Sequence, residues 1–300
     1  MTHGVICFIT RLKNNVCYTV REEENSMTIL RLAKLLLFYI IFYACLAAFA
    51  ALMFKIFLNT LDSNKPKWTL DESLIGTNPG ITVRPVLNDN PIEYRAGDSD
   101  YMRMWNEKLT EFLEPYLSGT RSENVQNCFH QQYPDSGKVC NVKLTSEFTP
   151  CLPPYNFGFD FDNSDKGPCI FLKLNKIFDW VPKYYHKENI PADMPTELAQ
   201  KIINAELVNQ HDKIWVDCRP NNVSDVGNLG DVSYYPQQGF EGKYFPYTNV
   251  EGYLSPLVAV HFEKPKRGIP FDIVCKAWAA NIQHDRKYNK GLVRFTLHVH

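Results

Sequence analysis

The side chains of this sequence that could perform catalysis are few and lie far apart. Asp160-Phe161-Asp162 has a spacing with which two carboxylates can hold a divalent metal, as in lumenal glycosyltransferases. The same segment is rich in turn-forming residues and is followed by Lys166-Gly167-Pro168, which is typical of an acidic turn. We favour the turn, because a metal-dependent transferase needs an α/β nucleotide-binding core and the strand-rich pattern described below does not supply one.

Two histidines near the C-terminus are a second candidate site. His298 and His300 alternate on one face of an expected strand and could bind a metal together, but an isolated pair at a chain end is more typical of solvated side chains. The sequence contains no GxGxxG, GxxxxGK[ST], GxSxG or HExxH motif. It therefore predicts no catalytic residues, no cofactor and no metal.

Cysteines are the remaining reactive side chains, and they are unevenly distributed. Six of the nine follow a long apolar stretch: Cys128, Cys140, Cys151, Cys169, Cys218 and Cys275. An even number in such a region indicates a disulfide framework, and paired cysteines would disfavour Cys-His nucleophilic catalysis. Six cysteines can pair in fifteen ways. Their linear order suggests Cys128 with Cys140, Cys151 with Cys169, and Cys218 with Cys275.

The apolar stretch from Leu35 to Phe54 is twenty residues long and carries no charge. As a helix rising about 1.5 Å per residue it would extend about 30 Å, the thickness of the hydrocarbon core of a bilayer. Lys34 and Lys55 flank it and could place their ammonium groups among the lipid headgroups. A buried core helix and a cleaved signal peptide are both disfavoured by its length, and 34 residues precede it. We expect one transmembrane helix over residues 35–58, in contact with the lipid bilayer.

The orientation of this helix follows from cysteines rather than from flanking charge. Three basic residues lie within twenty residues on each side, so the positive-inside rule does not decide. Disulfides need an oxidising compartment, and the only sequon, Asn222-Val223-Ser224, lies on the same side as the six cysteines. We expect a type II protein with a cytosolic tail over residues 1–34, glycosylated at Asn222. Cys7 and Cys17 would then be cytosolic and Cys45 would lie in the membrane.

Overall composition limits the class of protein. Hydrophobic residues make up 45% and charged residues 22%, which excludes a largely disordered chain. The 32 basic and 33 acidic residues give a net charge of −1, and no basic stripe is present. A nucleic-acid partner is therefore not expected.

The large C-terminal region has the pattern of a mainly β domain. Strands rich in β-branched and aromatic residues are expected over 139–148, 169–174, 213–218, 254–262, 271–277 and 292–300. Helices are expected to start at Asp98-Ser99-Asp100 and run to Leu117, and to cover 196–208. This favours an antiparallel β-sandwich with one or two helices over a doubly wound sheet. The polar, proline-containing stretch 59–97 reads as a stalk, which places the sandwich domain at 98–300.

Two sets of residues suggest protein interfaces. Tyr39 and Tyr43 share a face of the apolar helix, and Tyr43 lies near its middle, where a hydroxyl facing lipid would be costly. Ala44 and Ala48 have the spacing that lets two membrane helices approach closely. Outside the helix, tyrosine, phenylalanine and proline are concentrated over 234–262, which suits a protein interface. The same composition would also suit loops that pack on their own sandwich.

Several segments together give the sequence a resemblance to a known family. They are Leu36 to Ala48, Pro168-Cys-Ile-Phe-Leu-Lys-Leu-Asn-Lys-Ile177, Tyr244-Phe-Pro-Tyr247, Tyr253-Leu-Ser-Pro-Leu-Val-Ala-Val-His-Phe262 and Cys275-Lys-Ala277. With the six cysteines, they make the chain similar to the beta subunit of the sodium/potassium-transporting ATPase over most of residues 30–300. The gastric proton/potassium pump's beta subunit belongs to the same family.

The resemblance implies a non-catalytic plasma-membrane glycoprotein with an immunoglobulin-like exterior domain, obligately paired with a catalytic alpha subunit. In that family the beta subunit helps the alpha subunit to fold and to reach the plasma membrane, and it influences potassium occlusion. The resemblance also implies that Tyr39 and Tyr43 pack on an alpha transmembrane helix. A second implied contact, with an exterior alpha loop, involves Tyr244, Phe245, Pro246, Tyr247, Tyr253 and Leu254 within the stretches 244–247 and 253–260.

The chain departs from the family pattern at three places. Ala44 and Ala48 stand where the family has glycine, the family's Gly-Arg-Thr element and following tryptophan are absent from residues 1–34, and only one sequon is present. The sequence leaves open whether the partner is a sodium/potassium or a proton/potassium pump. The alternative function is that of a single-pass adhesion protein acting independently of a pump.

Overall fold

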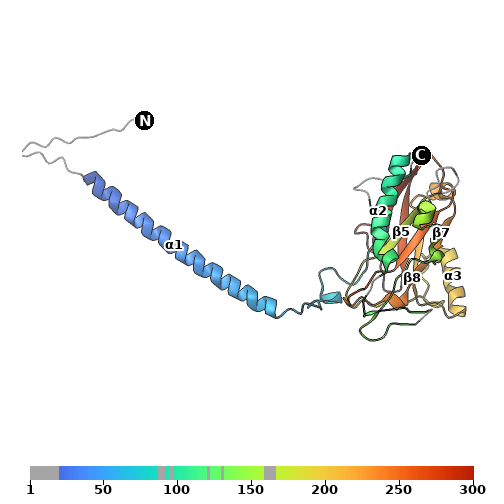
Figure 1. The fold of residues 1–300 in the computed structure, drawn as a ribbon, viewed down its shortest axis with the longest axis horizontal. Helices are drawn as coiled ribbons and strands as arrows, with labels where there is room; N and C mark the ends of the chain where they lie inside the picture. The colour runs from blue at the N-terminus through green and yellow to red at the C-terminus, as the bar shows by residue number, and fades with distance from the viewer. Residues whose placement is uncertain (1–19, 87–91, 95–97, 120–121, 130–131, 159–166) are drawn as a thin grey trace, which may run out of the picture. The chain divides into compact units, whose positions relative to one another are not determined.

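The computed structural model describes residues 20–86, 92–94, 98–119, 122–129, 132–158 and 167–300 of the chain. The chain divides into two compact units, residues 1–62 and 63–300, and each is described by itself. The first unit contains one helix, and the second contains the sheets and the remaining helices in the described ranges (Figure 1).

Helix α1 (Val20–Asn59) is longer than the expected span of 35–58. Its first residues are rich in helix formers such as glutamate, arginine and leucine and contain no glycine or proline, so nothing in the sequence stops the helix before the apolar run. At its C-terminal end the amide and the hydroxyl of Thr60 both donate to the carbonyl oxygen of Phe57, at 3.0 and 2.7 Å. These bonds satisfy a carbonyl that the end of the helix would otherwise leave free.

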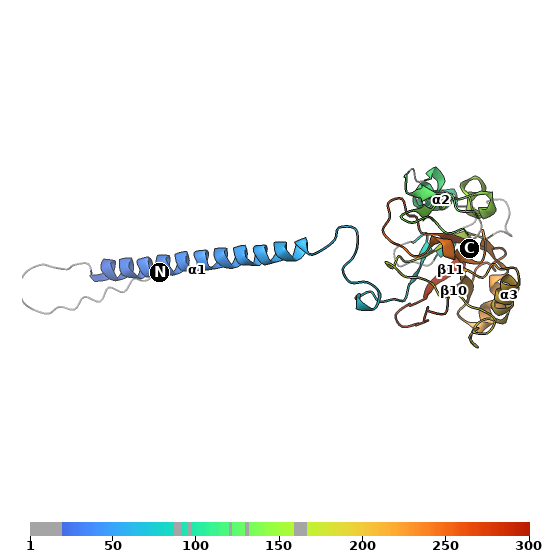
Figure 2. The same cartoon turned by 90° about the horizontal axis from the view of Figure 1, so that it is seen from below.

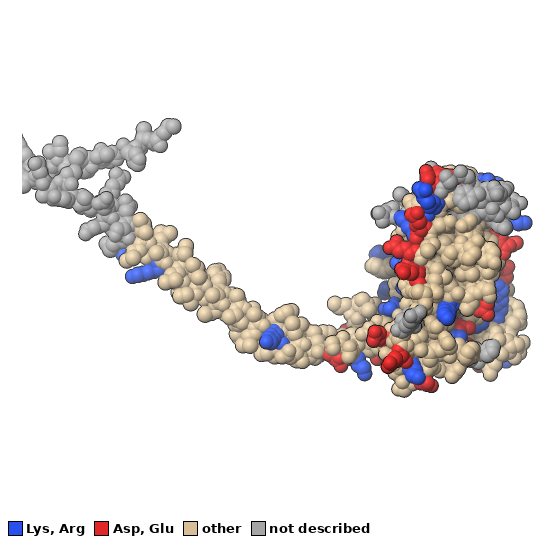
Figure 3. All heavy atoms as spheres, in the orientation of Figure 1, with Lys and Arg blue, Asp and Glu red and all other residues tan. Residues whose placement is uncertain are grey.

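The surface of α1 is apolar along most of its length. Within the described residues, Thr28–Asn59 is the one helix long and apolar enough to cross a membrane. Its side chains are exposed, and Figure 3 shows basic side chains toward its two ends with an uncharged surface between them. A helix that is apolar all round and not covered by protein suits a hydrocarbon surrounding.

The second unit is built on two main sheets. The first has the order β1-β5-β9-β7 and is antiparallel throughout; its strands are β1 (Ile81–Arg84), β5 (Cys169–Leu174), β7 (Val232–Tyr235) and β9 (Leu257–Phe262). The second has the order β2-β11-β10-β6-β8; its strands are β2 (Ile92–Tyr94), β6 (Lys213–Pro220), β8 (Gly239–Glu241), β10 (Pro270–Trp278) and β11 (Leu292–Val299). It is antiparallel except for β2, which pairs parallel with β11.

The remaining elements of the unit are a third, two-stranded sheet, the helices and several 3₁₀ turns. Strands β3 (Val125–Gln126) and β4 (Val139–Cys140) form a parallel pair. The helices are α2 (Ser99–Ser118), α3 (Thr196–Leu207) and α4 (Val226–Leu229), and the 3₁₀ turns are η1 (Leu70–Glu72), η2 (Ser146–Phe148), η3 (Pro153–Gly158), η4 (Val223–Asp225) and η5 (Gly242–Tyr244). The whole is mainly β, as the sequence predicts.

The two main sheets face each other across one hydrophobic core. Phe262 at the end of β9 meets Phe295 of β11 edge to face, with ring centroids 6.4 Å apart. The backbone amide of Cys218 on β6 donates to the hydroxyl of Tyr234 on β7 at 2.8 Å. Both contacts join one sheet to the other, and the buried aliphatic residues of both sheets belong to the same cluster. This is the expected sandwich.

Helix α2 covers the other face of the first sheet. Asp98 caps it by accepting from the amides of Asp100 and Tyr101 at 3.2 and 3.1 Å, where the sequence predicts the helix to start. The ring of Phe112 on α2 lies 6.4 Å from that of Phe171 on β5. Because both faces of this sheet are covered, β9 is buried along its whole length and β5 along nearly all of it.

Helix α3 covers the outer face of the second sheet, so the layers run α2, first sheet, second sheet, α3. Figure 2 shows α2 and α3 on opposite sides of the sheets. Leu198 and Ile202 of α3 pack with Trp215 and Trp278 in a small separate cluster. The two tryptophans are cross-strand neighbours on β6 and β10. Because side chains alternate between the two faces of a sheet, both tryptophans lie on the outer face, where α3 packs on them.

Three disulfides join the six cysteines in the sequential order that the linear arrangement suggests. They are Cys128–Cys140, Cys151–Cys169 and Cys218–Cys275. Cys218 and Cys275 are direct neighbours on β6 and β10. Among the described residues the one free cysteine is Cys45, on α1.

The structure corrects two boundaries. The stalk expected over 59–97 contains β1 and β2, because residues 81–84 pair with β5 and residues 92–94 with β11; the sandwich therefore begins before residue 98. The strand expected over 139–148 is limited to Val139–Cys140. Val142 and Phe148 are buried as that prediction requires, but the rest of the segment has no strand beside it to pair with in the described chain.

The other expected elements are present with small shifts. The strand expected from residue 254 begins at Leu257, directly after Pro256, which has no amide to donate to a ladder. The strands expected over 213–218 and 271–277 are each two residues longer in the structure. The strand expected to end at residue 300 and the helix expected to end at residue 208 each stop one residue earlier. The short strands β7 and β8 were not predicted.

Candidate docking surfaces

Tyr39 and Tyr43 stack on the surface of α1. Their ring centroids are 6.2 Å apart with planes 25° from parallel. Residues four apart in a helix lie on one face, so Ala47 and Ala51 continue the same row toward the C-terminal end of the helix. The row offers two phenol rings and then two small side chains, a shape on which a second membrane helix can pack closely.

A second aromatic pair on α1 provides a comparison. Phe38 and Phe42 also stack, with ring centroids 6.3 Å apart, but they have no hydroxyl. The predicted small residues Ala44 and Ala48 are four apart and lie in a row beside that of the tyrosines. Tyr43 is therefore the side chain that brings a polar group toward the middle of the apolar run, where such a group needs a partner.

In the second unit, the predicted aromatic loop packs along the segment that follows β5. Tyr247 and Phe178 form an isolated parallel β-bridge, and the backbone amide of Asp179 donates to the carbonyl oxygen of Tyr247 at 2.9 Å. Ring contacts extend this pairing: the centroids of Phe178 and Tyr247 are 6.4 Å apart, and those of Trp180 and Phe245 are 5.9 Å apart. The two segments therefore form one surface.

Tyr247 lies at the centre of this surface. Its ring centroid is 4.9 Å from that of Tyr253, and the ammonium group of Lys176 lies 4.9 and 5.1 Å from the two centroids. Such distances allow cation–π attraction. We call this group the aromatic cluster: Lys176, Phe178, Tyr247 and Tyr253.

The aromatic cluster lies beside the point where the chain enters the second unit. The hydroxyl of Tyr247 donates to Asn249 at 2.8 Å, and the amide of Asn249 donates to the carbonyl oxygen of Asn64 at 3.1 Å. Asn64 lies five residues after the last residue of α1. The cluster is thus linked by hydrogen bonds to the residues that follow the apolar helix in the chain.

The remaining predicted loop residues have different surroundings. Tyr244, Phe245 and Leu254 pack against the core of their own sandwich, and burial raises the pKa of the Tyr244 phenol above its ordinary value. Pro246 is exposed and Tyr247 is half-buried. The self-packing alternative thus accounts for part of the loop, whereas Pro246 and Tyr247 are open to a partner.

The stretch 253–260 named by the resemblance is accessible only at its start. Val258 and Val260 lie within β9 and are fully buried, so they cannot touch a partner. Sequence reasoning also missed Phe178 and Lys176. Lys176 lies within the Pro168–Ile177 segment and Phe178 follows it directly, but only the fold brings them beside Tyr247.

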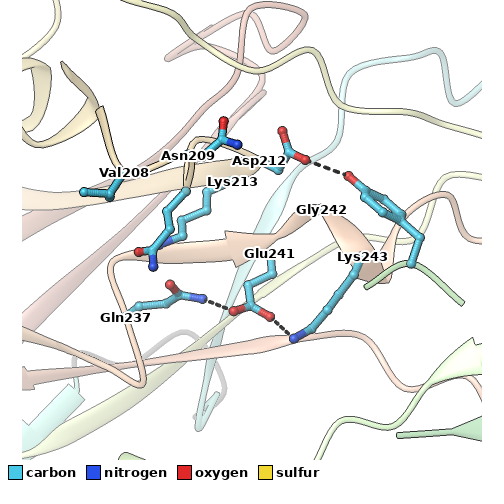
Figure 4. Close-up of a pocket in the computed structure, with 10 residues that line it drawn as sticks. Val208, Asn209, Asp212, Lys213, Gln237, Glu241, Gly242 and Lys243 are labelled. Carbon is cyan, nitrogen blue, oxygen red and sulfur yellow. Dashed lines mark hydrogen bonds and ion pairs between the residues drawn. The ribbon is translucent and has the colours of Figure 1, made fainter. Parts of the chain in front are cut away.

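A polar pocket of about 320 Å³ is one candidate site for a small ligand (Figure 4). Its two carboxylates are bonded within the pocket: Tyr133 donates to Asp212 at 3.3 Å, Gln237 donates to Glu241 at 2.7 Å, and Lys243 forms an ion pair with Glu241. These bonds account for the acids structurally and leave no paired nucleophile and base.

The other predicted sites are placed as follows. The rings of His298 and His300 lie 3.8 Å apart, but the described part of the chain brings no three metal-ligating side chains together. Asp160 and Asp162 lie outside the described residues. Asn222 is exposed, as a glycosylation site requires.

These features define a class of protein: a membrane protein with one apolar spanning helix among its described residues, whose large domain is a disulfide-bonded β-sandwich with an aromatic surface. The sequence model of the family described as "Sodium / potassium ATPase beta chain" matches residues 14–297, and the chain belongs to this family.

Relatives agree with this assignment. The sodium/potassium-transporting ATPase subunits beta-2 and beta-1 of Drosophila melanogaster are 43% and 39% identical to this chain over 277 and 274 residues; each alignment covers 88% of the chain, and 84% and 85% of the relative. The mouse beta-2 subunit is 26% identical over 284 residues, covering 89% of the chain and 86% of the relative. The family is that of the pump's accessory beta subunit, so this chain is a non-catalytic accessory subunit.

Proposed function

We propose that this chain binds the catalytic alpha subunit of a sodium/potassium-transporting ATPase, and that it supports the folding, membrane delivery and stability of that subunit and modulates sodium and potassium transport. The observation that carries this proposal is the family match over residues 14–297. The relatives described above are all named as subunits of the sodium/potassium pump, which favours that partner over a proton/potassium pump.

We also propose a type II orientation at the plasma membrane, with residues 1–34 cytoplasmic and the sandwich outside. The three disulfides support an oxidising environment for the second unit. The exposed sequon at Asn222 supports the same side.

Two surfaces are proposed to bind the alpha subunit. One is the row of Tyr39 and Tyr43 with its small neighbours on α1, which suits a transmembrane helix. The other is the outward part of the aromatic loop around Tyr247, which suits an exterior loop. Contact at two places would hold the subunits in one orientation.

Replacing Tyr39 and Tyr43 together by leucine is expected to weaken association with the alpha subunit by about tenfold. The substitution removes both hydroxyls and flattens the stacked pair, and interhelical hydrogen bonds in membranes contribute about 1–2 kcal/mol in peptide studies. The measurement is the amount of alpha subunit that co-purifies with the tagged full-length chain in mild detergent.

The matched control for this experiment is the replacement of Phe38 and Phe42 by leucine. That pair has the same spacing and the same stacked arrangement on α1 but no hydroxyl. Because the rings of Phe38 and Phe42 contact those of Tyr39 and Tyr43 edge to face, with centroids 5.5 and 5.4 Å apart, it should cause a clearly smaller loss of alpha subunit than the tyrosine change. Equal losses from the two double variants would show that the tyrosine face has no special role.

Asn222 is expected to carry a glycan. Treatment of the full-length chain with an amide-cleaving glycosidase should reduce its apparent mass, and Asn222→Gln and Ser224→Ala should each abolish that shift, because each destroys the sequon. A chain made in the secretory pathway that shows no shift would contradict the assignment of Asn222.

A further inference from the structure

Two basic side chains lie on the face of the first sheet that α2 covers, and a third follows the end of β5. Lys173 on β5 and Thr82 on β1 are cross-strand partners, and Arg84 is two residues further along β1, so Arg84 and Lys173 point to the same side. The guanidinium of Arg84 lies 5.9 Å from the ring centroid of Phe112 on α2, which identifies this side. Lys176 follows β5 by two residues and belongs to the aromatic cluster.

Arg84 and Lys173 are partly buried, and Lys176 is exposed. Burial lowers the pKa of Lys173 below its ordinary value, and the positive charges of Lys176 and Arg84 lower it further. Partial desolvation also lowers the pKa of the exposed Lys176. Bringing like charges together and removing them from water both cost free energy unless an opposite charge compensates.

Within the described residues, no carboxylate supplies that compensation. Arg84 donates to the carbonyl oxygen of Val83 at 3.2 Å and otherwise contacts the Phe112 ring. Lys176 contacts the two tyrosine rings of the aromatic cluster. Glu111 on α2 lines the same surface depression as Arg84 but forms no ion pair with it.

A carboxylate is the chemistry that this arrangement fits. The guanidinium of Arg84 and the ammonium group of Lys173 present donors on one side of the sheet, and the charge of Lys176 acts on Lys173 as well. The aromatic cluster beside them would exclude water and strengthen the attraction to a carboxylate. We propose that Arg84, Lys173 and Lys176 receive an aspartate or glutamate side chain from an exterior loop of the alpha subunit. This inference rests on the proposed function and adds the chemical identity of the group that the alpha subunit contributes.

Anionic lipid headgroups are the other source of negative charge near a membrane. The negative surface potential of cell membranes belongs mainly to the cytoplasmic leaflet, whereas the proposed orientation places the second unit outside. The basic group also adjoins the aromatic surface, since Lys176 contacts Tyr247, and it is not an isolated patch of positive charge. Both points favour a protein carboxylate.

The test measures how much alpha subunit co-purifies with the tagged, full-length chain at about 0.1 M and about 1 M salt, between which the Debye length falls from about 10 to about 3 Å. Lys176→Glu should reduce recovery about tenfold at the lower salt, since close charge pairs at interfaces are strongly coupled. Lys176→Met, which keeps an apolar stem, should cause a smaller loss and should reduce the salt dependence, because one of the three positive charges is gone. Replacing the matching acid of the alpha loop by lysine should restore binding to Lys176→Glu.

Lys201→Glu is the matched control. Lys201 is an exposed lysine on α3, on the opposite outer layer of the sandwich, where it bonds to Gln238 at 2.7 Å. The same change of charge there should leave recovery unchanged. Equal protease resistance of all variants would show that they are folded, and the salt dependence of the unmodified chain tests the inference even if Lys176→Glu does not fold.

The possible failures are distinguishable. If the unmodified chain recovers no alpha subunit, the proposed function fails and the inference fails with it. If it recovers the alpha subunit but Lys176→Glu, Lys176→Met and Lys201→Glu all match it and salt has no effect, the inference alone is overturned. If Lys176→Glu abolishes binding to vesicles containing phosphatidylserine while alpha recovery is unchanged, the cluster binds lipid and the proposal is wrong.

Discussion

Replacing Cys218 and Cys275 together by alanine is expected to lower the free energy of unfolding of the sandwich by about 4 kcal/mol. The bond closes a loop with a sequence separation of 57 residues, and on the chain-entropy model a cross-link of this length removes that much freedom from the unfolded chain. Whole domains are stable by only about 5–15 kcal/mol, so much of the variant should fail to mature. Urea unfolding of the full-length chain and the amount delivered to the cell surface both measure this.

Two comparisons sharpen this experiment. Removing Cys128–Cys140, with a separation of 12 residues, should cost less, about 3 kcal/mol on the same model. Cys45→Ala should leave the stability of the sandwich unchanged, because Cys45 is on α1 and is not in a disulfide. Similar stability of the unmodified chain and the Cys218/Cys275 variant would refute a structural role for the bond.

Phe171→Ala is expected to destabilise the sandwich by about 3–5 kcal/mol, the usual cost of truncating a buried phenylalanine to alanine. Phe171 is fully buried on β5, and its ring lies 6.4 Å from that of Phe112 on α2 and 6.2 Å from that of Phe157. The substitution therefore leaves a cavity between α2 and the first sheet. The midpoint of urea unfolding measures the loss.

Phe129→Ala is the control for that change. Phe129 is 73% exposed, so the same truncation should alter stability by no more than about 0.5 kcal/mol. If the two variants unfold at the same urea concentration, Phe171 does not hold α2 to the sheet as described.

The two proposed surfaces would bind the alpha subunit through two different kinds of contact. On α1, the tyrosine row offers shape and a hydroxyl in a medium that supplies no water, so close packing and hydrogen bonding would decide association there. Around Tyr247, half-buried aromatic rings lie beside uncompensated positive charge, so both area and electrostatics would contribute. An alpha subunit that satisfies both would be selected over one that satisfies only one.

Much of the architecture could be predicted from the sequence because it depends on local pattern. The uncharged run from Leu35 to Phe54 can be satisfied only in an apolar surrounding, and α1 contains it. Asp98 starts α2 as its capping chemistry requires, and the six cysteines pair in sequential order. Strand β5 has the bounds expected from its apolar, β-branched composition.

The tertiary structure decided what local pattern does not encode. Strands β1, β2, β7 and β8 are three or four residues long and gain their stability from the neighbours they pair with, so their sequences alone do not identify them. For the same reason the segment after Cys140, which has a strand-like composition, leaves the sheet. The tyrosines of the aromatic loop look alike in sequence, but the fold packs Tyr244 against the core of its own sandwich and places Tyr247 beside Phe178, Tyr253 and Lys176.

The sequence by itself determined that this chain has one membrane helix, a disulfide-bonded β domain and a family, because periodicity, charge and cysteine order are properties of the chain. Only the fold decided which side chains share a surface. Arg84 and Lys173 are far apart in sequence and meet because β1 pairs with β5, and Lys176 meets Tyr247 because the segment after β5 packs along the aromatic loop. Contacts of this kind are set by strand pairing and packing, which no single segment specifies.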